Sequence, residues 1–229
     1  MPYRSNQSHK PCRSVPNRTT DGMRNFQPIF IVPIGPILAR LGTIRISKMQ
    51  ELKIEIGDIT PANIQQLKVI NVSTLPVRYT DKFYNDLLAL YGKQFMKFAV
   101  WHGFNIGAVC ARVEKHETKE DYSKLYIMTI NVIPAYRRRK IASTLLNHIL
   151  EKAAQDPNIL EAYLHVQTSN TDAKQFYLSH GFVEIGIVEN YYKRVDPTSA
   201  YIFKKSLKDG HVISMDYVKV DNYAEGAQE

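Results

Sequence analysis

The segment LYIMTINVIPAYRRRKIA, residues 125–142, decides the fold that we expect for this chain. Its first part, Leu125–Val132, is an apolar run of strand length, and Arg138–Ala154 has the apolar spacing of an amphipathic helix. The basic run Arg137–Lys140 lies between them. Because unpaired backbone N–H groups and the helix dipole point outward at a helix N-terminus, this order predicts an anion-binding site. The alternative for the basic run taken alone is a solvated charged surface.

Weaker patterns extend on both sides of this unit. Apolar periodicity predicts further strands at residues 52–56, 95–101, 105–113, 162–166, 183–188 and 200–204. Capping residues predict helices that begin at Thr60-Pro61, Thr80 and Asn170, the last of them ending before Gly181. The pair His102-Gly103 suits a hairpin turn. The resulting order, β-α-α-β-β-β-α-β-α-β-β, predicts an α/β chain with a mixed sheet and helices on its faces.

Charge is concentrated in the N-terminal part of the chain. The 229 residues carry a net charge of +8, and residues 1–50 hold eight Lys and Arg against the single acid Asp21. Residues 1–48 are also rich in proline and lack a sustained period, so we expect a basic, disordered extension there. A folded domain is expected at residues 49–208 and a loose tail at residues 209–229. The basic charge is therefore weak evidence that the folded part binds nucleic acid.

Cysteine content and hydropathy bear on the compartment. Cys12 and Cys110 do not make a disulfide framework, and Cys110 in an apolar strand is expected to be a small buried side chain. No apolar run reaches about 18 residues, so neither a membrane span nor a membrane partner is expected. We expect a cytoplasmic location, with which a nuclear pool is compatible. Mitochondrial delivery by the Arg-rich extension is less favoured, because its prolines interrupt the amphipathic helix of such signals.

The loop at residues 137–142 resembles the acetyl-CoA pyrophosphate loop of the GNAT superfamily of N-acetyltransferases, Gln/Arg-x-x-Gly-x-Gly/Ala. Arg137 fills the first position and Ala142 the last, whereas Lys140 and Asn131 stand where this family has glycines. Further blocks resemble N-terminal acetyltransferases of the superfamily in order and spacing: Ile56–Pro61, Leu75–Tyr79, Asp81–Tyr84, Gly107–Cys110, Leu125–Thr129, Tyr163–Gln167, Phe176-Tyr177, His180–Phe182 and Asn190–Arg194. The resemblance covers about Leu52–Leu207 and implies the GNAT fold, in which the middle strands of a mixed sheet splay apart.

Three catalytic residues are implied by the resemblance: Tyr126, His165 and Tyr177. Tyr126 and His165 would act through a water as the general base toward the substrate's α-ammonium group, and Tyr177 would protonate the leaving thiolate. An imidazole also suits this role on chemical grounds, because its ordinary pKa lies near neutrality. Taken alone, Tyr126 is a core aromatic residue, and a single histidine on a strand is more often structural.

Two sets of binding residues are implied as well. Acetyl-CoA, the expected co-substrate, would contact Met128, Thr129, Ile130, Val132, Arg137, Arg138, Arg139, Lys140, Ile141, Ala142, Asn170 and Tyr177. The peptide N-terminus would contact Leu75, Pro76, Val77, Tyr79, Tyr126, Met128, His165, Tyr191, Tyr192 and Val195. Aromatic walls over an apolar slot suit a small hydrophobic first residue such as methionine. Asn170 has the alternative, or additional, role of a helix cap, and no metal is expected.

Two functions of different classes agree with these features. The first is an N-α-acetyltransferase for protein N-termini, with methionine followed by a hydrophobic residue as the expected sequence and lysine side chains as related substrates. The second is a catalytically weak binding subunit of a ribosome-associated N-terminal acetyltransferase complex, whose catalytic and auxiliary subunits would be its partners. Lys140 and Asn131 favour the second function, and retention of Tyr126 and His165 favours the first. A third, weaker hypothesis is that the basic extension binds RNA or ribosomal phosphates.

Overall fold

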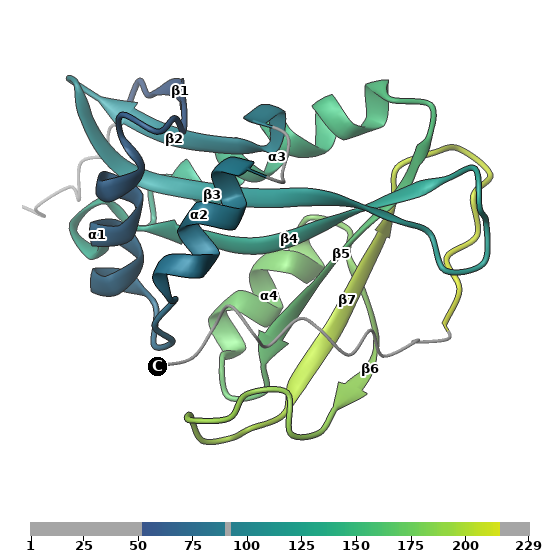
Figure 1. The fold of residues 1–229 in the computed structure, drawn as a ribbon. Coiled ribbons are helices and arrows are strands. Elements are labelled where there is room, and N and C mark those ends of the chain that lie inside the picture. Colours follow the sequence, from purple (N-terminus) through teal and green to yellow (C-terminus); the bar gives the residue numbers. More distant parts are fainter. Residues whose placement is uncertain (1–51, 90–92, 216–229) are drawn as a thin grey trace, which may run out of the picture. The chain divides into compact units, whose positions relative to one another are not determined.

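The computed structural model describes residues 52–89 and 93–215 of the chain (Figure 1). The elements in chain order are β1 (Glu55–Asp58), α1 (Ile64–Thr74), α2 (Asp81–Ala89), η2 (Lys93–Phe95), β2 (Met96–Trp101), β3 (Phe104–Lys115), β4 (Ser123–Val132), η3 (Pro134–Tyr136), α3 (Ile141–Gln155), β5 (Ile159–Gln167), α4 (Thr171–Ser179), β6 (Val183–Val188) and β7 (Ala200–Ser206). The predicted order of strands and α-helices is confirmed. The predicted extension at residues 1–48 and residues 216–229 of the predicted tail lie outside the described residues.

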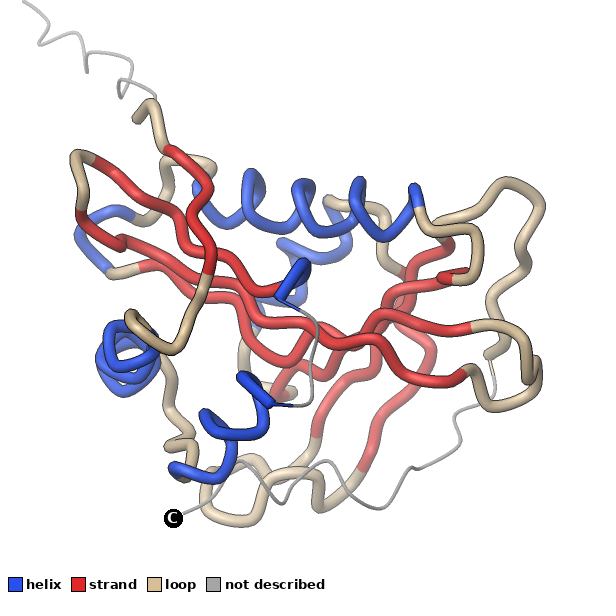
Figure 2. Tube along the Cα trace, turned by 45° about the horizontal axis from the view of Figure 1, so that its top comes forward, coloured by secondary structure: helices blue, strands red, loops and turns tan. Residues whose placement is uncertain are grey.

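The strands form one mixed sheet in the order β1-β2-β3-β4-β5-β7-β6. The β4–β5 pair is parallel, and the other neighbours are antiparallel. Helices α1 and α2 pack on one face and α3 and α4 on the other (Figure 2). Each face has its own buried cluster, with Leu67 and Leu87 in the first and Leu145 and Tyr177 in the second. The predicted mixed sheet with helices on its faces is therefore confirmed.

Short-range signals account for several element ends. His102 and Gly103 have φ angles of 48° and 81° and form the tight turn between β2 and β3, as predicted. The side chain of Thr80 accepts a hydrogen bond of 3.4 Å from a backbone N–H at the start of α2. Asn170 does the same at the start of α4, at 3.0 Å. Gly181 follows α4 with a φ of 77°, which confirms its predicted place beyond the helix end.

The first helix begins later than predicted. Helix α1 starts at Ile64, and Thr60 is not its cap. The side chain of Asn63 accepts a hydrogen bond of 2.7 Å from the N–H of Thr60 and donates one of 2.9 Å to the carbonyl of Asp58. These two bonds hold residues 61–63 in a turn, so the Thr-Pro pair begins a turn rather than a helix.

Two other element starts also differ from the prediction. Strand β1 begins at Glu55 and not at Leu52. Helix α3 begins at Ile141 and not at Arg138, because Arg138 and Lys140 have φ angles of 62° and 61°. A left-handed residue cannot continue a right-handed helix. The basic run therefore forms the loop before α3 and not its first turn.

An irregularity in β4 lies beside the site. Thr129 pairs with Cys110 while Ile127 pairs with Ala111, so Met128 is an extra residue on β4. Such a bulge shifts the alternation of side chains by one residue. The apolar residues of β4 in the cluster on the α3 side are therefore odd-numbered before the bulge and even-numbered after it: Leu125, Ile127, Ile130 and Val132.

Strands β4 and β5 part close to this bulge. Their parallel ladder ends at the pair Tyr126 and Tyr163. Beyond it, β4 continues along β3 to Val132, and β5 continues along β7 to Gln167. Within the described ranges no further β4–β5 pair follows. The edge of β4 toward β5 therefore carries backbone groups without a strand partner, which agrees with the splayed middle strands expected for this fold.

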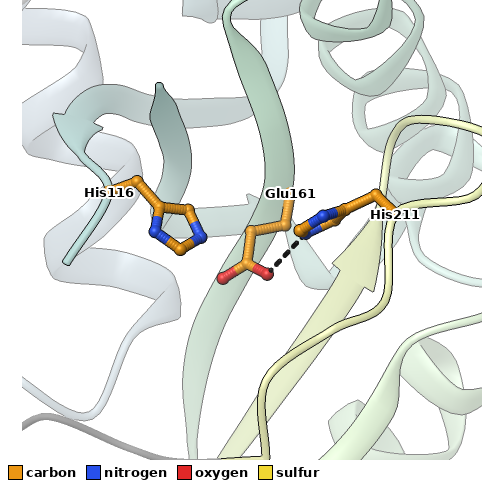
Figure 3. Close-up of side chains that lie close together, drawn as sticks. All are labelled: His116, Glu161 and His211. Carbon is orange, nitrogen blue, oxygen red and sulfur yellow. Dashed lines mark hydrogen bonds and ion pairs between the residues drawn. The ribbon is translucent and has the colours of Figure 1, made fainter. Parts of the chain in front are cut away.

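The segment after β7 is attached to the sheet. The Nε2 of His211 lies 3.2 Å from one carboxylate oxygen of Glu161 (Figure 3). The Nζ of Lys204 lies 3.2 Å from the other. Lys204 also donates a hydrogen bond of 3.3 Å to the backbone carbonyl of Ser214. The side chain of Glu161 is fully buried, and that of His211 is 6% exposed. The tail that was predicted to be loose from residue 209 is therefore anchored to the domain as far as Ser214.

Two smaller expectations concern membranes and the buried thiol. None of the helices in the described parts of the chain is long and apolar enough to cross a bilayer.

Cys110 is fully buried, as expected, and burial raises the pKa of its thiol to about 12. Because the thiolate is the reactive form, this cysteine is a packing residue.

Candidate active site

A cleft of about 610 Å³ is lined by residues from the parting ends of β4 and β5. Its other walls are the loop between α1 and α2, the start of α3 with the loop before it, α4, and the β6–β7 loop. The predicted site residues that line it are Leu75, Pro76, Val77, Tyr79, Met128, Thr129, Ile130, Val132, Arg137, Arg138, Lys140, Ile141, Ala142, His165, Asn170, Tyr177 and Tyr192. The fold thus brings six elements and loops around one space.

Four predicted residues do not line this cleft: Tyr126, Arg139, Tyr191 and Val195. Tyr126 is only 7% exposed, and its hydroxyl lies 2.9 Å from the hydroxyl of Tyr191. Both rings therefore lie behind the cleft surface, in contact with residues that form it. Val195 lines a smaller adjoining pocket, together with Tyr192. Arg139 borders neither space.

Asn131, which stands where the family has a glycine, lines the cleft as well. Other residues line it that the sequence did not single out: Thr74, Ile127, Tyr136, Ser143, Val166, Gln167, Asp172, Ala173 and Phe176. Two of them carried a usable signal. Gln167 lies two residues after His165 on β5, so strand alternation places it on the same face. Ser143 lies in the first turn of α3, directly after the basic loop. The others reach the cleft through packing that periodicity does not reveal.

An aromatic cluster surrounds the imidazole of His165. The ring of Tyr191 stacks on it at a centroid distance of 4.3 Å and an angle of 17°. The rings of Tyr126 and Tyr163 lie edge to face with it, at 5.8 and 6.0 Å. Burial, with a smaller contribution from Lys124, lowers the pKa of His165 to about 3. The imidazole is therefore neutral at physiological pH, and it is a weaker base than the near-neutral pKa expected from the residue type alone.

The tyrosines of the site keep their protons. Burial raises the pKa of Tyr126, Tyr177 and Tyr191 well above the ordinary value, and that of Tyr192 to about 12. Tyr177 lines the cleft from α4, with its ring packed against Phe182 at 5.5 Å. A neutral phenol in this position is a proton donor, which fits protonation of a leaving thiolate.

The loop between β4 and α3 has the features of a phosphate site. Arg137 donates a hydrogen bond of 2.9 Å from its Nε to the carbonyl of Val132, so its side chain also fixes the turn at the end of β4. Arg138 and Lys140, both exposed and left-handed, line the cleft beside the N-terminus of α3. The first backbone N–H groups of α3 have no partner within the helix, and with the helix dipole they favour an anion.

A second polar group lies apart from the residues that line the cleft. One nitrogen or oxygen each of His116, Glu161 and His211 lies within 4.8 Å of the others, a spacing that would suit a metal ion (Figure 3). The hydrogen bonds favour another arrangement. The Nδ1 of His116 accepts from the N–H of Thr118, and that of His211 faces the ammonium of Lys119 at 3.3 Å. Each ring is thus assigned its proton on Nε2, the atom a metal would need. The absence of a metal stays a prediction.

Together these features define a class of protein. A cationic helix N-terminus suits the diphosphate of coenzyme A, and the open edge of β4 suits the amides of its pantetheine arm. A neutral, half-buried histidine and a protonated tyrosine stand at the other end of the same cleft. This arrangement fits an acyltransferase that uses acetyl-CoA as the acyl donor and an amine as the acceptor.

Comparison with known proteins gives the family. The sequence model of the Acetyltransferase (GNAT) family matches residues 64–182, and the chain belongs to this family. It is 42% identical to N-alpha-acetyltransferase 50 of Danio rerio over 156 residues, which cover 68% of this chain and 90% of that protein. It is 39% identical over 160 residues to the probable N-acetyltransferase san of Drosophila melanogaster, covering 70% and 84% of the two chains.

A solved structure agrees with these relatives. Arabidopsis thaliana Naa50 in complex with the bisubstrate analogue CoA-Ac-MVNAL superposes with a TM-score of 0.61 at 37% sequence identity, covering 68% of this chain and 99% of that one. The chain is therefore an acetyl-CoA-dependent N-terminal acetyltransferase of the GNAT family. The expected GNAT fold is confirmed with it.

Proposed function

We propose that this chain acetylates the α-amino group of proteins that begin with methionine followed by a hydrophobic residue. The observation that carries the proposal is one continuous cleft. It has a phosphate site at the start of α3, His165 on β5, and an apolar slot between the α1–α2 loop and Tyr192. The cleft thus offers one place for acetyl-CoA, one for an amine and one for the side chain beside that amine.

The slot has the chemistry of a methionine site. Leu75, Pro76 and Val77 form one wall, Tyr79 contributes an aromatic ring, and Tyr192 faces them from the β6–β7 loop. A methionine side chain is flexible and apolar, and its thioether makes favourable contacts with aromatic rings. The Arabidopsis structure holds an analogue whose peptide part, MVNAL, begins with methionine and valine. That analogue supports the same first two residues as substrates here.

The residues divide the chemistry among them. Acetyl-CoA supplies the activated acetyl group when it is bound. The neutral form of the substrate's α-amine attacks the thioester carbonyl. His165, neutral at pH 7, accepts through a water the proton that this nitrogen loses as the amide forms and the C–S bond breaks, and the hydroxyl pair of Tyr126 and Tyr191 borders that imidazole. The bulge at Met128 leaves backbone N–H groups for the developing oxyanion. Tyr177 returns a proton to the thiolate.

A peptide series tests this proposal. Peptides that begin with Met-Leu or Met-Val should be acetylated with kcat/KM values at least roughly 10-fold above that of Ala-Leu, because one methylene group in an apolar pocket is by itself worth roughly 10–200-fold and alanine lacks more than that. The measurement is release of free thiol from acetyl-CoA, with mass spectrometry to place the acetyl group. A peptide with a blocked N-terminus and an internal lysine serves as the control. Equal rates on all free N-termini would contradict the methionine slot, and a faster rate on the blocked peptide would identify a lysine acetyltransferase.

The second candidate, a binding subunit with weak chemistry, is tested at Lys140. Its backbone already has the left-handed conformation that a glycine would adopt, and its side chain is exposed. The wild-type chain should therefore bind acetyl-CoA, and Lys140→Gly should change the Kd by less than about tenfold. The same substitution should change the free energy of unfolding little. It relieves left-handed backbone strain of about 1–2 kcal/mol, and this gain is partly offset by the conformational entropy of glycine in the unfolded chain, about 0.5–1 kcal/mol.

Isothermal titration with acetyl-CoA gives the Kd, and urea unfolding gives the stability. Lys140→Ala is the matched control, because it removes the charge but keeps the left-handed Cβ. Absence of binding by the wild type, restored by Lys140→Gly, would overturn the enzyme function and leave the binding subunit.

A further inference from the structure

A small pocket adjoins the methionine slot and is lined by cations. It has a volume of about 170 Å³, and three of its lining residues are Arg78, Lys193 and Arg194. It shares Pro76, Val77 and Tyr192 with the main cleft. The same two loops that form the walls of the slot therefore continue into a basic space.

The three cations are available for a ligand. All three side chains belong to exposed residues, and within the described ranges none of them forms an ion pair or hydrogen bond. The acids nearest in the sequence, Glu189 and Asp196, do not line the pocket. Three unpaired cations around one pocket with no lining acid produce a local positive potential that attracts carboxylates.

The position of this pocket identifies its occupant. A substrate peptide enters with its amine near His165 and its first side chain in the slot, so the rest of the peptide must leave between the two loops. An extended peptide advances about 3.3 Å per residue, which brings the residues after the second past the basic pocket. We infer that Arg78, Lys193 and Arg194 form a subsite that selects acidic residues at the third to fifth positions of the substrate N-terminus.

This inference rests on the proposed function for the direction of the peptide, but it makes a separate claim. The methionine slot selects the first residue by apolar packing, whereas the basic pocket selects later residues by charge. Exposed ion pairs are individually weak, so two of them together should change kcat/KM by about 3–30-fold. The change should lie in KM, because these residues are remote from the reacting atoms.

Three peptides that differ only at the fourth and fifth positions test the subsite: Met-Leu-Ala-Glu-Glu, Met-Leu-Ala-Gln-Gln and Met-Leu-Ala-Lys-Lys, each extended by the same neutral sequence. The glutamate peptide should have the highest kcat/KM and the lysine peptide the lowest, and raising the salt should reduce the difference. Lys193→Gln/Arg194→Gln should reduce the preference, and Lys193→Glu/Arg194→Glu should reverse it. The matched control is Lys53→Gln/Lys115→Gln, which removes the same charge from exposed positions outside both pockets and should keep the preference.

Binding of the same peptides, labelled with a fluorophore at the C-terminus, is measured by anisotropy in parallel. Equal turnover and equal binding of the three peptides would overturn the subsite and leave the acetyltransferase function in place. A preference that the control variant also loses would overturn it too, because overall charge would then be the cause. Charge-dependent binding without acetylation of any peptide would support the subsite and contradict the proposed function.

Discussion

Replacement of His165 by alanine is expected to lower kcat/KM for a Met-Leu peptide by about 10²–10⁴, the range that a positioned acid–base group contributes. The reason is its environment. The imidazole lines the cleft, stacks on Tyr191 at 4.3 Å and is held neutral by burial. Alanine removes the proton acceptor and leaves the phosphate site untouched, so the Kd for acetyl-CoA should stay within about threefold of the wild-type value.

The matched control is His148→Ala, a half-buried histidine on α3 that does not line the cleft. It should retain near wild-type kcat/KM. A retained rate in His165→Ala, with acetyl-CoA binding intact, would show that this imidazole is not the base. Loss of acetyl-CoA binding in the same variant would indicate a structural role instead.

The pH dependence of the wild-type enzyme tests the same assignment in another way. Since burial lowers the pKa of His165 to about 3, this histidine stays neutral throughout the range from pH 5 to 9. The group that titrates there is the substrate's α-amine, whose ordinary pKa is about 7.7–8.0. The logarithm of kcat/KM should therefore rise with a slope of one up to about pH 8 and then level off. A second break near pH 6.5, with a steeper slope below it, would show that the histidine also titrates.

Glu161→Ala is expected to lower the free energy of unfolding by about 3–5 kcal/mol, the usual effect of removing one partner from a buried ion pair. The side chains of Glu161 and Lys204 are 0% and 7% exposed. Alanine would leave the ammonium of Lys204 in the interior without its carboxylate. It would also release His211 and, with it, the segment after β7.

Urea unfolding followed by circular dichroism measures this effect, and limited proteolysis after residue 208 reports on the released segment. The control is Glu184→Ala, which breaks a partly exposed pair with Lys174 and should change stability by no more than about 1 kcal/mol. The double variant Glu161→Leu/Lys204→Met should recover much of the loss, because apolar replacement of a whole buried pair is often neutral. An unchanged unfolding midpoint in Glu161→Ala would contradict the buried pair as a source of stability.

Much of the fold could be predicted because its signals are local. Alternation identified the strands, and the caps Thr80 and Asn170 identified two helix starts. The start of α1 could not be predicted, because the side chain of Asn63 accepts a hydrogen bond from the backbone N–H of Thr60, and this turn replaces the helix start that the Thr-Pro pair suggests. The predicted start of α3 was wrong because the basic run before this helix adopts left-handed backbone conformations, which the amino-acid composition does not reveal.

The site residues could be predicted where the family resemblance pointed to them. They could not be predicted where tertiary packing determines which side chains reach the cleft. Most of the named residues line one cleft, but Tyr126 and Tyr191 lie behind its surface as a hydrogen-bonded pair. The bulge at Met128 depends on the register between two strands, which one sequence does not specify. The group of His116, Glu161 and His211 joins three segments that are distant in the sequence, and no local pattern reveals it.

A buried amide pair connects the two halves of the active site. The side chain of Asn131 on β4 donates a hydrogen bond of 2.7 Å to Asn71 on α1, and both residues are almost fully buried. Asn131 lines the cleft beside the expected coenzyme path, and α1 leads into the slot wall at Leu75. A shift of β4 on acetyl-CoA binding would therefore move the wall that receives the peptide. By thermodynamic linkage each substrate would then change the affinity of the other by the same factor.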